Sequence, residues 1–523
     1  MRRFLLLLVA GLTGYIGLSY EILWVRLYSF LTGATAASFG VLLGTYLLGL
    51  AAGSLASWIY CDERAARGDS ARLRVPAALV LAASALAFFL IPVLAALVRR
   101  GSFLPSLLLV GAVAGLLGAL LPILSHFGIR PDEHAGEWLS YLYMANIAGS
   151  AAGSLLTGFF LLDRLSLKGI SVFLALLGVV LALLLILSSH LRRLPLALWT
   201  ALPLLGAALV VGFAPTLFDR IYEKLQFRRT YTPATTFAHL VENRHGVITV
   251  LEDGTVYGGG VYDGVYSTSL ADDRNLIVRA YVLSAVHPRP SRVLVIGISS
   301  GSFVQVIANN PFVERLTVVE INPGYLSLIP QYPQVASLLR NPKIEIFIDD
   351  GRRWLRAHPE RRFDAVVNNM TWHWRSQATN LLSVEFLRLV QSRLAPGGVL
   401  LNNTTFSLDA QKTACTVFPY GFRFTNHMAV GDSPMGFDQD RWRQVLAGYQ
   451  IDGRPVFDLE RPEHRARFEE VLRLGPTPNG REEGRNRNFQ TCSNILKWTA
   501  GNRIVTDDNM ATEWYRPWWA LPD

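Results

Sequence analysis

Long apolar segments in the first 216 residues constrain the fold of this chain more than any other feature. Each segment is about as long as a helix that crosses a lipid bilayer. They cover residues 4–23, 34–60, 75–98, 103–127, 139–162, 169–189 and 195–215. We therefore predict a bundle of about seven transmembrane helices over residues 1–216. The first segment follows Met1, Arg2 and Arg3 as a signal peptide would, but it lacks a small-residue cleavage pattern, so we expect it to be retained.

Two kinds of residue stand out within the apolar segments. Charged groups at membrane depth are unfavourable unless they are paired, so we expect Glu21 to pair with Arg26 near one membrane face. Pairs of glycines four residues apart allow helices to pack closely in lipid. These pairs are Gly40 with Gly44, Gly49 with Gly53, and Gly149 with Gly153.

The orientation in the membrane is not decided by the basic residues. We count nine arginines and lysines on the side of the N-terminus and nine on the other side, so the positive-inside rule favours neither side. Seven helices place the soluble half across the membrane from the N-terminus.

Cys415 and Cys492 both lie in that half, and they could form a disulfide if it faced an oxidising space; two unpaired thiols are the alternative.

A basic connector and a β-rich segment begin the soluble half. The connector, residues 217–235, carries Lys224, Arg228 and Arg229, which can meet anionic lipid head groups. Residues 236–290 alternate short strands with glycine-containing turns. We expect these turns to bring three side chains toward the site that the segment covers: Tyr262, Asp263 and Tyr266.

Strands then alternate with helices over residues 291–430, which predicts a Rossmann-like, mostly parallel sheet that binds ligands beyond the carboxyl ends of its strands. The expected helices cover residues 302–309, 324–340, 351–357 and 383–394. The strand ends carry Gly297, Glu320, Asp349 with Asp350, Asn368 with Asn369, and Asn402 with Asn403. Residues 431–523 form an extension in which an amphipathic helix is expected over 461–474.

The turn after the first of these strands is typical of a nucleotide site. Gly297 and Gly301 let the backbone approach a ligand, and free N–H groups at the start of the next helix attract polar groups. About twenty residues later Glu320 can accept both hydroxyls of a ribose, and Asp350 can accept from an adenine amino group. A helix-capping or turn role for these acids is the alternative.

The motifs VLVIG, VVEIN, DDGRRWL and FDAVVNN, together with the earlier YDG, resemble the spermidine synthase family, a branch of the S-adenosylmethionine methyltransferase-like fold. The segments SYEILWVRLYSF, GTYLLGLAAGS and YMANIAGSAAGS resemble bacterial proteins that fuse a membrane domain to such a domain. The resemblance implies a cofactor site made of Gly297, Ser299, Gly301, Glu320, Asp349, Asp350 and Gly351.

The chain departs from that family at acidic positions. Ser300 stands where the family has the loop aspartate that meets the amine of the cofactor, and Asn369 and Trp372 stand where the family has two acids for the acceptor amine. The tyrosine, histidine and glutamate expected near residues 276–280 are also replaced. An amide cannot serve as a general base, so His373 is the candidate for that role, with Asn369 orienting the acceptor and Trp372 stacking on it. The alternative is that residues 372–374 form a packed loop in which the histidine has its hydrogen bonds satisfied.

These features predict a multi-pass protein of the bacterial inner membrane with its soluble domain in the cytoplasm. It would bind S-adenosylmethionine or its decarboxylated form and transfer an aminopropyl or other alkyl group to an amine or hydrophobic acceptor. The alternatives are a methyltransferase, a degenerate nucleotide sensor coupled to a transporter-like bundle, and a soluble half that faces the periplasm. The expected partners are membrane lipids and a small-molecule amine or lipid-borne acceptor, with a homodimer left open and neither metal nor nucleic acid.

Overall fold

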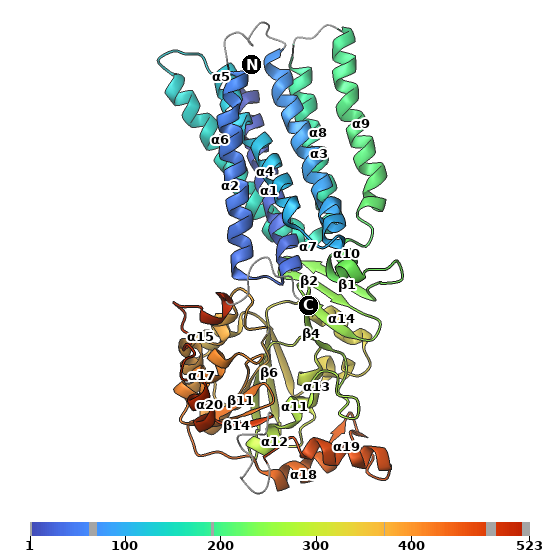
Figure 1. The fold of residues 1–523 in the computed structure, drawn as a ribbon, viewed down its shortest axis with the longest axis vertical. Coiled ribbons are helices and arrows are strands. Elements are labelled where there is room, and N and C mark those ends of the chain that lie inside the picture. Colours follow the sequence, from blue (N-terminus) through green and yellow to red (C-terminus); the bar gives the residue numbers. More distant parts are fainter. Residues whose placement is uncertain (1–2, 62–70, 190–192, 371, 477–487, 515–523) are drawn as a thin grey trace.

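The computed structural model describes residues 3–61, 71–189, 193–370, 372–476 and 488–514. A helical bundle and a soluble α/β part lie end to end (Figure 1). The bundle contains α1 (Arg3–Thr32), α2 (Ala36–Ala56), α3 (Ala71–Arg99), α4 (Leu104–Gly118), α5 (Leu120–Gly128), α6 (Ala135–Leu156), α7 (Leu162–Arg164), α8 (Leu167–Leu187) and α9 (Arg193–Leu217). Among the described residues, seven helical spans are long and apolar enough to cross a membrane, with α4–α5 and α6–α7 each counted as one.

Two of the three glycine pairs lie at helix contacts. A Cβ at Gly49 or Gly53 would collide with α4 at Gly111 or Gly115, and a Cβ at Gly149 or Gly153 would collide with α1. The absence of side chains therefore lets α2 approach α4, and α6 approach α1, through their backbones. The expectation for Gly40 and Gly44 is wrong, because a Cβ at either position would meet no described atom within 4 Å.

The chain enters the soluble part through α10 (Ile221–Phe227) and a four-stranded antiparallel sheet. Its strands are β1 (His239–Asn243), β2 (Gly246–Val250), β3 (Thr255–Gly258) and β4 (Val261–Val265), which pair in chain order. This sheet lies between the bundle and the rest of the soluble part (Figure 1).

An eight-stranded mixed sheet forms the centre of the soluble part, in the order β14-β10-β11-β9-β8-β5-β6-β7. The strands are β5 (Arg292–Ile296), β6 (Arg315–Glu320), β7 (Ile344–Ile348), β8 (Phe363–Asn368), β9 (Leu394–Asn403), β10 (Tyr420–Phe424), β11 (His427–Gly431) and β14 (Phe489–Thr491). The five strands β5 to β9 run parallel, and β11 pairs antiparallel with β9. The expected Rossmann-like architecture is therefore confirmed, with three further strands along one edge.

Helices cover both faces of this sheet. They are α11 (Val278–Tyr281), α12 (Leu283–Val286), α13 (Ser302–Ala308), α14 (Gly324–Leu328), α15 (Gly351–Ala357), α16 (Val384–Gln391), α17 (Leu408–Val417), α18 (Gln439–Ala447), α19 (Pro462–Leu472) and α20 (Cys492–Trp498). Alternate residues of β5 enter opposite cores: Val293 and Val295 pack in the core that includes α11 to α13, whereas Leu294 and Ile296 pack in the core that includes α15 to α17 and α20. A strand buried on both faces explains the unbroken apolar run in the sequence.

The helix expected over residues 324–340 is the main error in the elements. The structure ends α14 at Leu328 and continues with separate 3₁₀ turns at Ile329–Gln331 and Ala336–Arg340. Pro330 and Pro333 account for the break, because proline cannot donate the backbone hydrogen bond that a helix interior requires. A two-stranded ribbon of β12 (Gln450–Ile451) and β13 (Arg454–Pro455) completes the fold.

Candidate functional site

The turn between β5 and α13 is held in a conformation that favours glycine. Gly297 has φ +90° and Gly301 has φ +76°. A Cβ at Gly297 would lie 2.5 Å from the carbonyl oxygen of Asn369, and one at Gly301 would lie 2.7 Å from Leu338. Ser299 also adopts a positive φ, +48°, which is unusual for a residue with a side chain. Gly297 thus lets this turn approach the end of β8, and Gly301 lets it approach the 3₁₀ turn that contains Leu338.

Glu320, at the end of β6, holds the turn through hydrogen bonds to backbone N–H groups. Its carboxylate accepts hydrogen bonds from the backbone N–H groups of Ile298, at 2.7 Å, and Asn322, at 2.8 Å. The side chain is buried, and this burial raises the pKa of Glu320 to about 7, against the opposing effect of those N–H donors. Its protonation therefore changes near neutral pH, which is uncommon for a carboxylate.

Strand β4 is hydrogen-bonded to the same turn through two serine side chains. Ser299 donates from Oγ to the carbonyl oxygen of Asp263 at 2.5 Å, and Ser302 donates from Oγ to that of Val265 at 2.7 Å. The carboxylate of Asp263 accepts from the hydroxyl of Tyr325 at 2.5 Å. Burial raises the pKa of Asp263, and the bond from Tyr325 and the nearby Arg375 oppose that effect.

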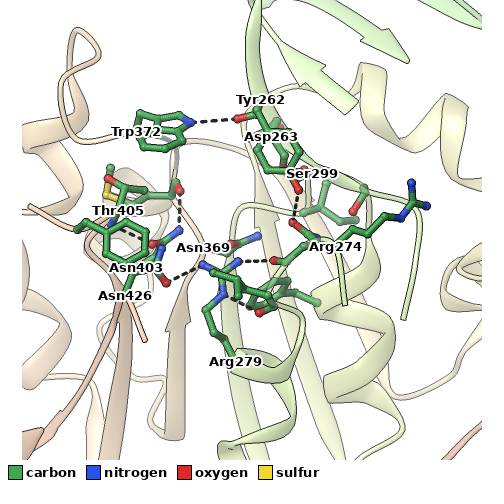
Figure 2. Close-up of a pocket in the computed structure, with 17 residues that line it drawn as sticks. Tyr262, Asp263, Arg274, Arg279, Ser299, Asn369, Trp372, Asn403, Thr405 and Asn426 are labelled. Carbon is green, nitrogen blue, oxygen red and sulfur yellow. Dashed lines mark hydrogen bonds between the residues drawn. The ribbon is translucent and has the colours of Figure 1, made fainter. Parts of the chain in front are cut away.

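A cavity of about 230 Å³ opens between this turn, β4 and the ends of β8 and β9. Figure 2 shows its labelled polar side chains converging from these elements. The lining residues are Tyr262, Asp263, Arg274, Asn275, Leu276, Arg279, Ile298, Ser299, Ser300, Phe303, Asn369, Met370, Trp372, Asn403, Thr405, Phe406 and Asn426. We call this cavity the strand-end pocket.

Hydrogen bonds fix one wall of the strand-end pocket, and the opposite wall has a strained backbone. The indole of Trp372 donates to the carbonyl oxygen of Tyr262 at 3.2 Å, and the hydroxyl of Tyr262 donates to the side chain of Asn275 at 2.8 Å (Figure 2). On the opposite wall Thr405 and Phe406 have φ values of +43° and +66°. Two adjacent residues with side chains in this region are strained, and such strain often accompanies a functional site.

Five residues proposed from sequence line the strand-end pocket together: Tyr262, Asp263, Ser299, Asn369 and Trp372. They come from three parts of the chain that are more than thirty residues apart in sequence. Tyr266 does not line the pocket; it stacks on Tyr332 with ring centroids 3.7 Å apart. The placement of the first five is compatible with substrate contact, and their roles stay predictions.

His373 lies behind the pocket wall. Its Nδ1 is 3.0 Å from the hydroxyl of Thr405, and its backbone N–H donates to the same hydroxyl at 2.9 Å. Burial lowers the pKa of His373, so the imidazole is neutral at pH 7. A neutral imidazole has the protonation state of a base, but in this structure His373 is not among the pocket-lining residues.

The expected adenine-binding residues lie at the start of α15. Asp350 caps this helix, since its Oδ1 accepts from the backbone N–H of Arg353 at 2.8 Å. Asp349 pairs with the guanidinium of Arg353 at 2.5 Å. A Cβ at Gly351 would approach Ile296 to 2.5 Å, so this position holds α15 against β5. None of the three lines the strand-end pocket.

Several lining residues were not proposed from sequence. Arg279 is the most informative, because it is a buried arginine on α11 within the apolar run LIVRAYVL. A charged residue inside such a run is the signal that could have found it. Asn275, Thr405 and Asn426 follow no comparable pattern, whereas Asn403 is one of the polar strand ends noted in the sequence.

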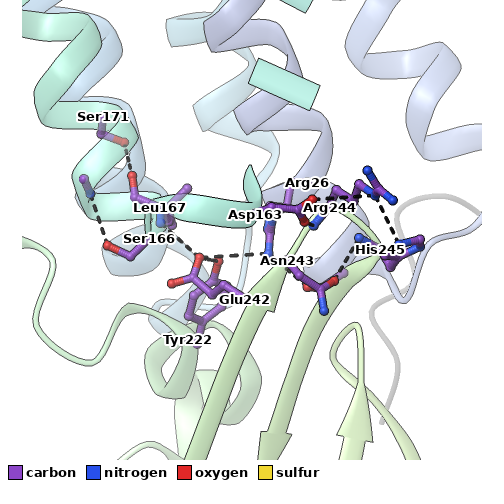
Figure 3. Close-up of polar contacts among 12 residues, drawn as sticks. Arg26, Asp163, Ser166, Leu167, Ser171, Tyr222, Glu242, Asn243, Arg244 and His245 are labelled. Atoms are coloured by element: carbon purple, nitrogen blue, oxygen red, sulfur yellow. Dashed lines mark hydrogen bonds and ion pairs between the residues drawn. The ribbon is translucent and has the colours of Figure 1, made fainter. Parts of the chain in front are cut away.

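A buried polar joint connects the soluble part to the bundle (Figure 3). Glu242 on β1 accepts at Oε2 from the hydroxyl of Tyr222 at 2.8 Å and from the backbone N–H of Leu167 at 3.0 Å. Arg26 lies 4.0 Å from the same carboxylate oxygen and donates to the carbonyl oxygen of Gly246 at 3.0 Å. The expected pair of Glu21 with Arg26 is therefore wrong, because β1 supplies the partner of Arg26.

The loop between α1 and α2 also contacts the segment that follows Trp372. The backbone N–H of Ser376 donates to the carbonyl oxygen of Ala34 at 2.7 Å, and Thr35 forms a β-bridge with Arg375. A Cβ at Gly33 would lie 2.7 Å from the ring of Trp374. One wall of the strand-end pocket is thus continuous with the end of the bundle that faces the soluble part.

Comparison with known proteins identifies one domain in the soluble half. Residues 280–416 match the spermine/spermidine synthase domain. A polyamine aminopropyltransferase of Desulforudis audaxviator is 30% identical over 178 residues, which are 33% of this chain and 60% of that protein. This match confirms the resemblance noted in the sequence.

Longer alignments extend into the apolar half. Polyamine aminopropyltransferase 2 of Streptomyces coelicolor is 27% identical, and a polyamine aminopropyltransferase of Mycobacterium tuberculosis is 28% identical, each over 418 residues. These alignments cover 76% of this chain and 73% and 77% of the relatives, more than the soluble half alone. A spermidine synthase of Thermotoga maritima aligns in structure over 46% of this chain and 88% of its own, with a TM-score of 0.34 and 18% identity.

Proposed function

We propose that this chain, whose C-terminal half carries a spermine/spermidine synthase domain, is an integral membrane transferase that uses S-adenosylmethionine or its decarboxylated form. The observation that carries the proposal is the strand-end pocket, which the matched domain shares with the β4 segment before it and which includes the glycine turn and the ends of β8 and β9. In an α/β domain, this is where a nucleotide is expected to bind.

The reaction would be an alkyl transfer that needs no metal. A neutral acceptor nitrogen attacks the chain carbon bonded to the sulfonium, the carbon–sulfur bond breaks, and its electron pair stays on sulfur to give methylthioadenosine. The acceptor then releases one proton. Because the sulfonium is already activated, the protein contributes alignment and a pocket that excludes water. Trp372 and Tyr262 would flank the acceptor, and Asn369 would orient it.

The acceptor would be a small amine or a lipid-borne molecule that reaches the pocket from the membrane. The loop at Gly33–Thr35 supports this proposal, because it contacts the residues directly after Trp372. We further propose that the protein lies in the bacterial inner membrane with its soluble domain in the cytoplasm, where the donor nucleotide is made. A homodimer would be compatible with this arrangement.

Titration calorimetry on the detergent-solubilised full-length protein tests the nucleotide site. We expect methylthioadenosine, which holds the adenosine part shared by both donors, to bind with a Kd in the micromolar range, about −8 kcal/mol. Product analysis then separates the reactions, since alkyl transfer releases methylthioadenosine and methyl transfer releases S-adenosylhomocysteine. Failure of methylthioadenosine and both donors to bind would contradict the proposal.

A nucleotide sensor without turnover is the second candidate. It is favoured by one observation: Asp263 is the single carboxylate among the residues that line the pocket, and it is already bonded to Tyr325. A sensor would bind the donor and release neither product when amines are supplied.

A further inference from the structure

Arg279 places a positive charge in the wall of the strand-end pocket. Its residue is 7% exposed, and its guanidinium lies 5.1 Å from the ring centre of Phe303. Burial lowers the pKa of Arg279 only to about 10, so the side chain is charged at neutral pH. A buried charge is strongly unfavourable unless a partner compensates it.

The partners that Arg279 has in the structure are neutral. Its guanidinium donates to the carbonyl oxygens of Leu276 and Asn275, at 2.7 and 2.8 Å, and to the side-chain oxygen of Asn426 at 2.8 Å. A guanidinium has five N–H groups, so these bonds leave two of them for a ligand. Among the described residues, no carboxylate forms an ion pair with Arg279. Asp273, the acid that most raises its pKa, accepts from backbone N–H groups of its own loop.

The remaining charges of the pocket do not offset Arg279. Asp263 is bonded to Tyr325, and Arg375 lies close enough to lower its pKa. Arg274 is half-exposed at the rim and already paired with Asp253 at 3.1 Å. Arg274 and Asp263 thus each have an oppositely charged neighbour outside the lining, which leaves the guanidinium of Arg279 available to an anionic group of a ligand.

We propose that Arg279 receives a carboxylate of the small molecule that occupies the strand-end pocket. This inference rests on the proposed function and names the class of ligand for the same site. The carboxylate has two sources. It belongs either to the donor, which is then S-adenosylmethionine itself, or to an acceptor of the amino-acid type. Arginine suits both, because its planar N–H groups match a carboxylate in a two-bond geometry.

A donor that keeps its carboxylate changes the transferred group and leaves the balance of the reaction unaltered. The acceptor nitrogen attacks the same sulfonium-bound carbon, methylthioadenosine leaves with the electron pair, and the acceptor loses one proton. The group transferred is then 3-amino-3-carboxypropyl. Transfer of this group agrees with the residues at positions 300 and 369, which are Ser300 and Asn369 rather than acids. A polyamine-forming site would be expected to have acids there to hold an ammonium group.

Two matched ligand pairs test the proposal by calorimetry on the detergent-solubilised full-length protein. S-adenosylmethionine and its decarboxylated form differ by one carboxylate, as do ornithine and putrescine, which are titrated with methylthioadenosine at saturation. We expect the carboxylate member of one pair to bind about ten-fold more tightly or better, the effect of one hydrogen bond between charged groups. The pair that shows the preference identifies the source of the carboxylate.

Variants assign the preference to Arg279. Arg279→Gln should reduce the ratio of the two affinities to about one, and Arg279→Lys, which keeps the charge, should retain part of it. Arg274→Gln removes a charge from the rim of the same pocket and should leave the ratio unchanged. If Arg279→Gln does not fold, the wild-type ratios and the lysine variant decide the question.

The outcomes that overturn the proposal are distinct from failure of the proposed function. If methylthioadenosine binds and neither carboxylate member is preferred, the inference fails and the nucleotide site stands. A preference that persists in Arg279→Gln also overturns it. If methylthioadenosine and both donors fail to bind, the proposed function and the inference fail together.

Discussion

At the scale of single residues, Glu320 links the fold to the pH at which the site would operate. Its carboxylate would bind ribose hydroxyls best when ionised, and its pKa is raised to about 7. We therefore expect methylthioadenosine to bind roughly ten-fold more weakly at pH 6 than above pH 8, since one pH unit below the pKa leaves about a tenth of the groups ionised. Calorimetric titration between pH 5.5 and 8.5 measures this directly.

The same residue predicts how stability changes with pH. Because the pKa of Glu320 is higher in the folded than in the unfolded protein, the folded state binds more protons between about pH 4.5 and 7. The contribution of this group is most favourable below that range and is lost as pH rises through it. Glu320→Gln cannot titrate, so it should flatten both profiles. An unchanged binding profile in this variant would contradict the ribose assignment.

Part of the site could be predicted from the sequence because the positions of some residues follow from the residues next to them in the chain. Gly297 and Glu320 follow buried strands, so their positions at the sheet edge could be inferred from the order of elements alone. Arg279 was missed because local sequence does not show that its guanidinium meets Asn426, nearly 150 residues later in the chain, at the pocket wall. We expected His373 in the pocket because it neighbours Trp372. In the structure its imidazole instead contacts the hydroxyl of Thr405, which lies in a strained turn.

At the scale of elements, the joint between β1 and the bundle depends on Glu242. The side chains of Arg26 and Glu242 are 8% and 12% exposed, so removal of the carboxylate would leave a buried charge without its partner. We expect Glu242→Ala to destabilise the joint by about 3 kcal/mol or more. Thermal unfolding of the detergent-solubilised protein measures this effect as a lower Tm.

Asp163→Ala provides a matched control at the same boundary. Asp163 pairs with Arg244 of the β1–β2 turn at 3.6 Å, but the two side chains are 35% and 46% exposed. Pairs in contact with water contribute about 0–1 kcal/mol, so this variant should change Tm little. Equal losses in the two variants would show that burial of the Arg26–Glu242 pair is not the source of its importance.

Helices and strands could be predicted where the spacing of apolar residues and the length of the segment both indicated the same kind of element. The parallel strands and the membrane helices follow from apolar runs, and α15 begins and ends at the expected residues, Gly351 and Ala357. Short edge strands were not predicted: β14 has three residues, and its pairing with β10 decides its conformation. The pairing of Arg26 was also beyond local pattern, because Glu242 lies more than two hundred residues away.

At the scale of the whole molecule, the side of the membrane on which the soluble part lies determines whether a donor nucleotide can reach it. Two features give opposite expectations. The proposed donor is made in the cytoplasm, whereas a disulfide joins Cys415 on α17 to Cys492 on α20. Disulfides are rare in reducing compartments, so this bond favours an oxidising space. The two cysteines are 6% and 8% exposed, which shields the bond from exchange with soluble thiols.

Reporter fusions at the C-terminus decide between these features. If the seven apolar spans among the described residues all cross the membrane, the soluble part lies across it from the start of α1, so one reporter position fixes the orientation of the whole chain. We expect a fluorescent reporter that folds only in the cytoplasm to be active and an alkaline phosphatase fusion to be inactive, because an enzyme cannot act where its donor is not supplied. The disulfide is buried, so alkylation of the denatured, unreduced protein should find Cys415 and Cys492 blocked. An active phosphatase fusion would contradict the cytoplasmic placement, and it would require the ligand at Arg279 to be a carboxylate available outside the cytoplasm.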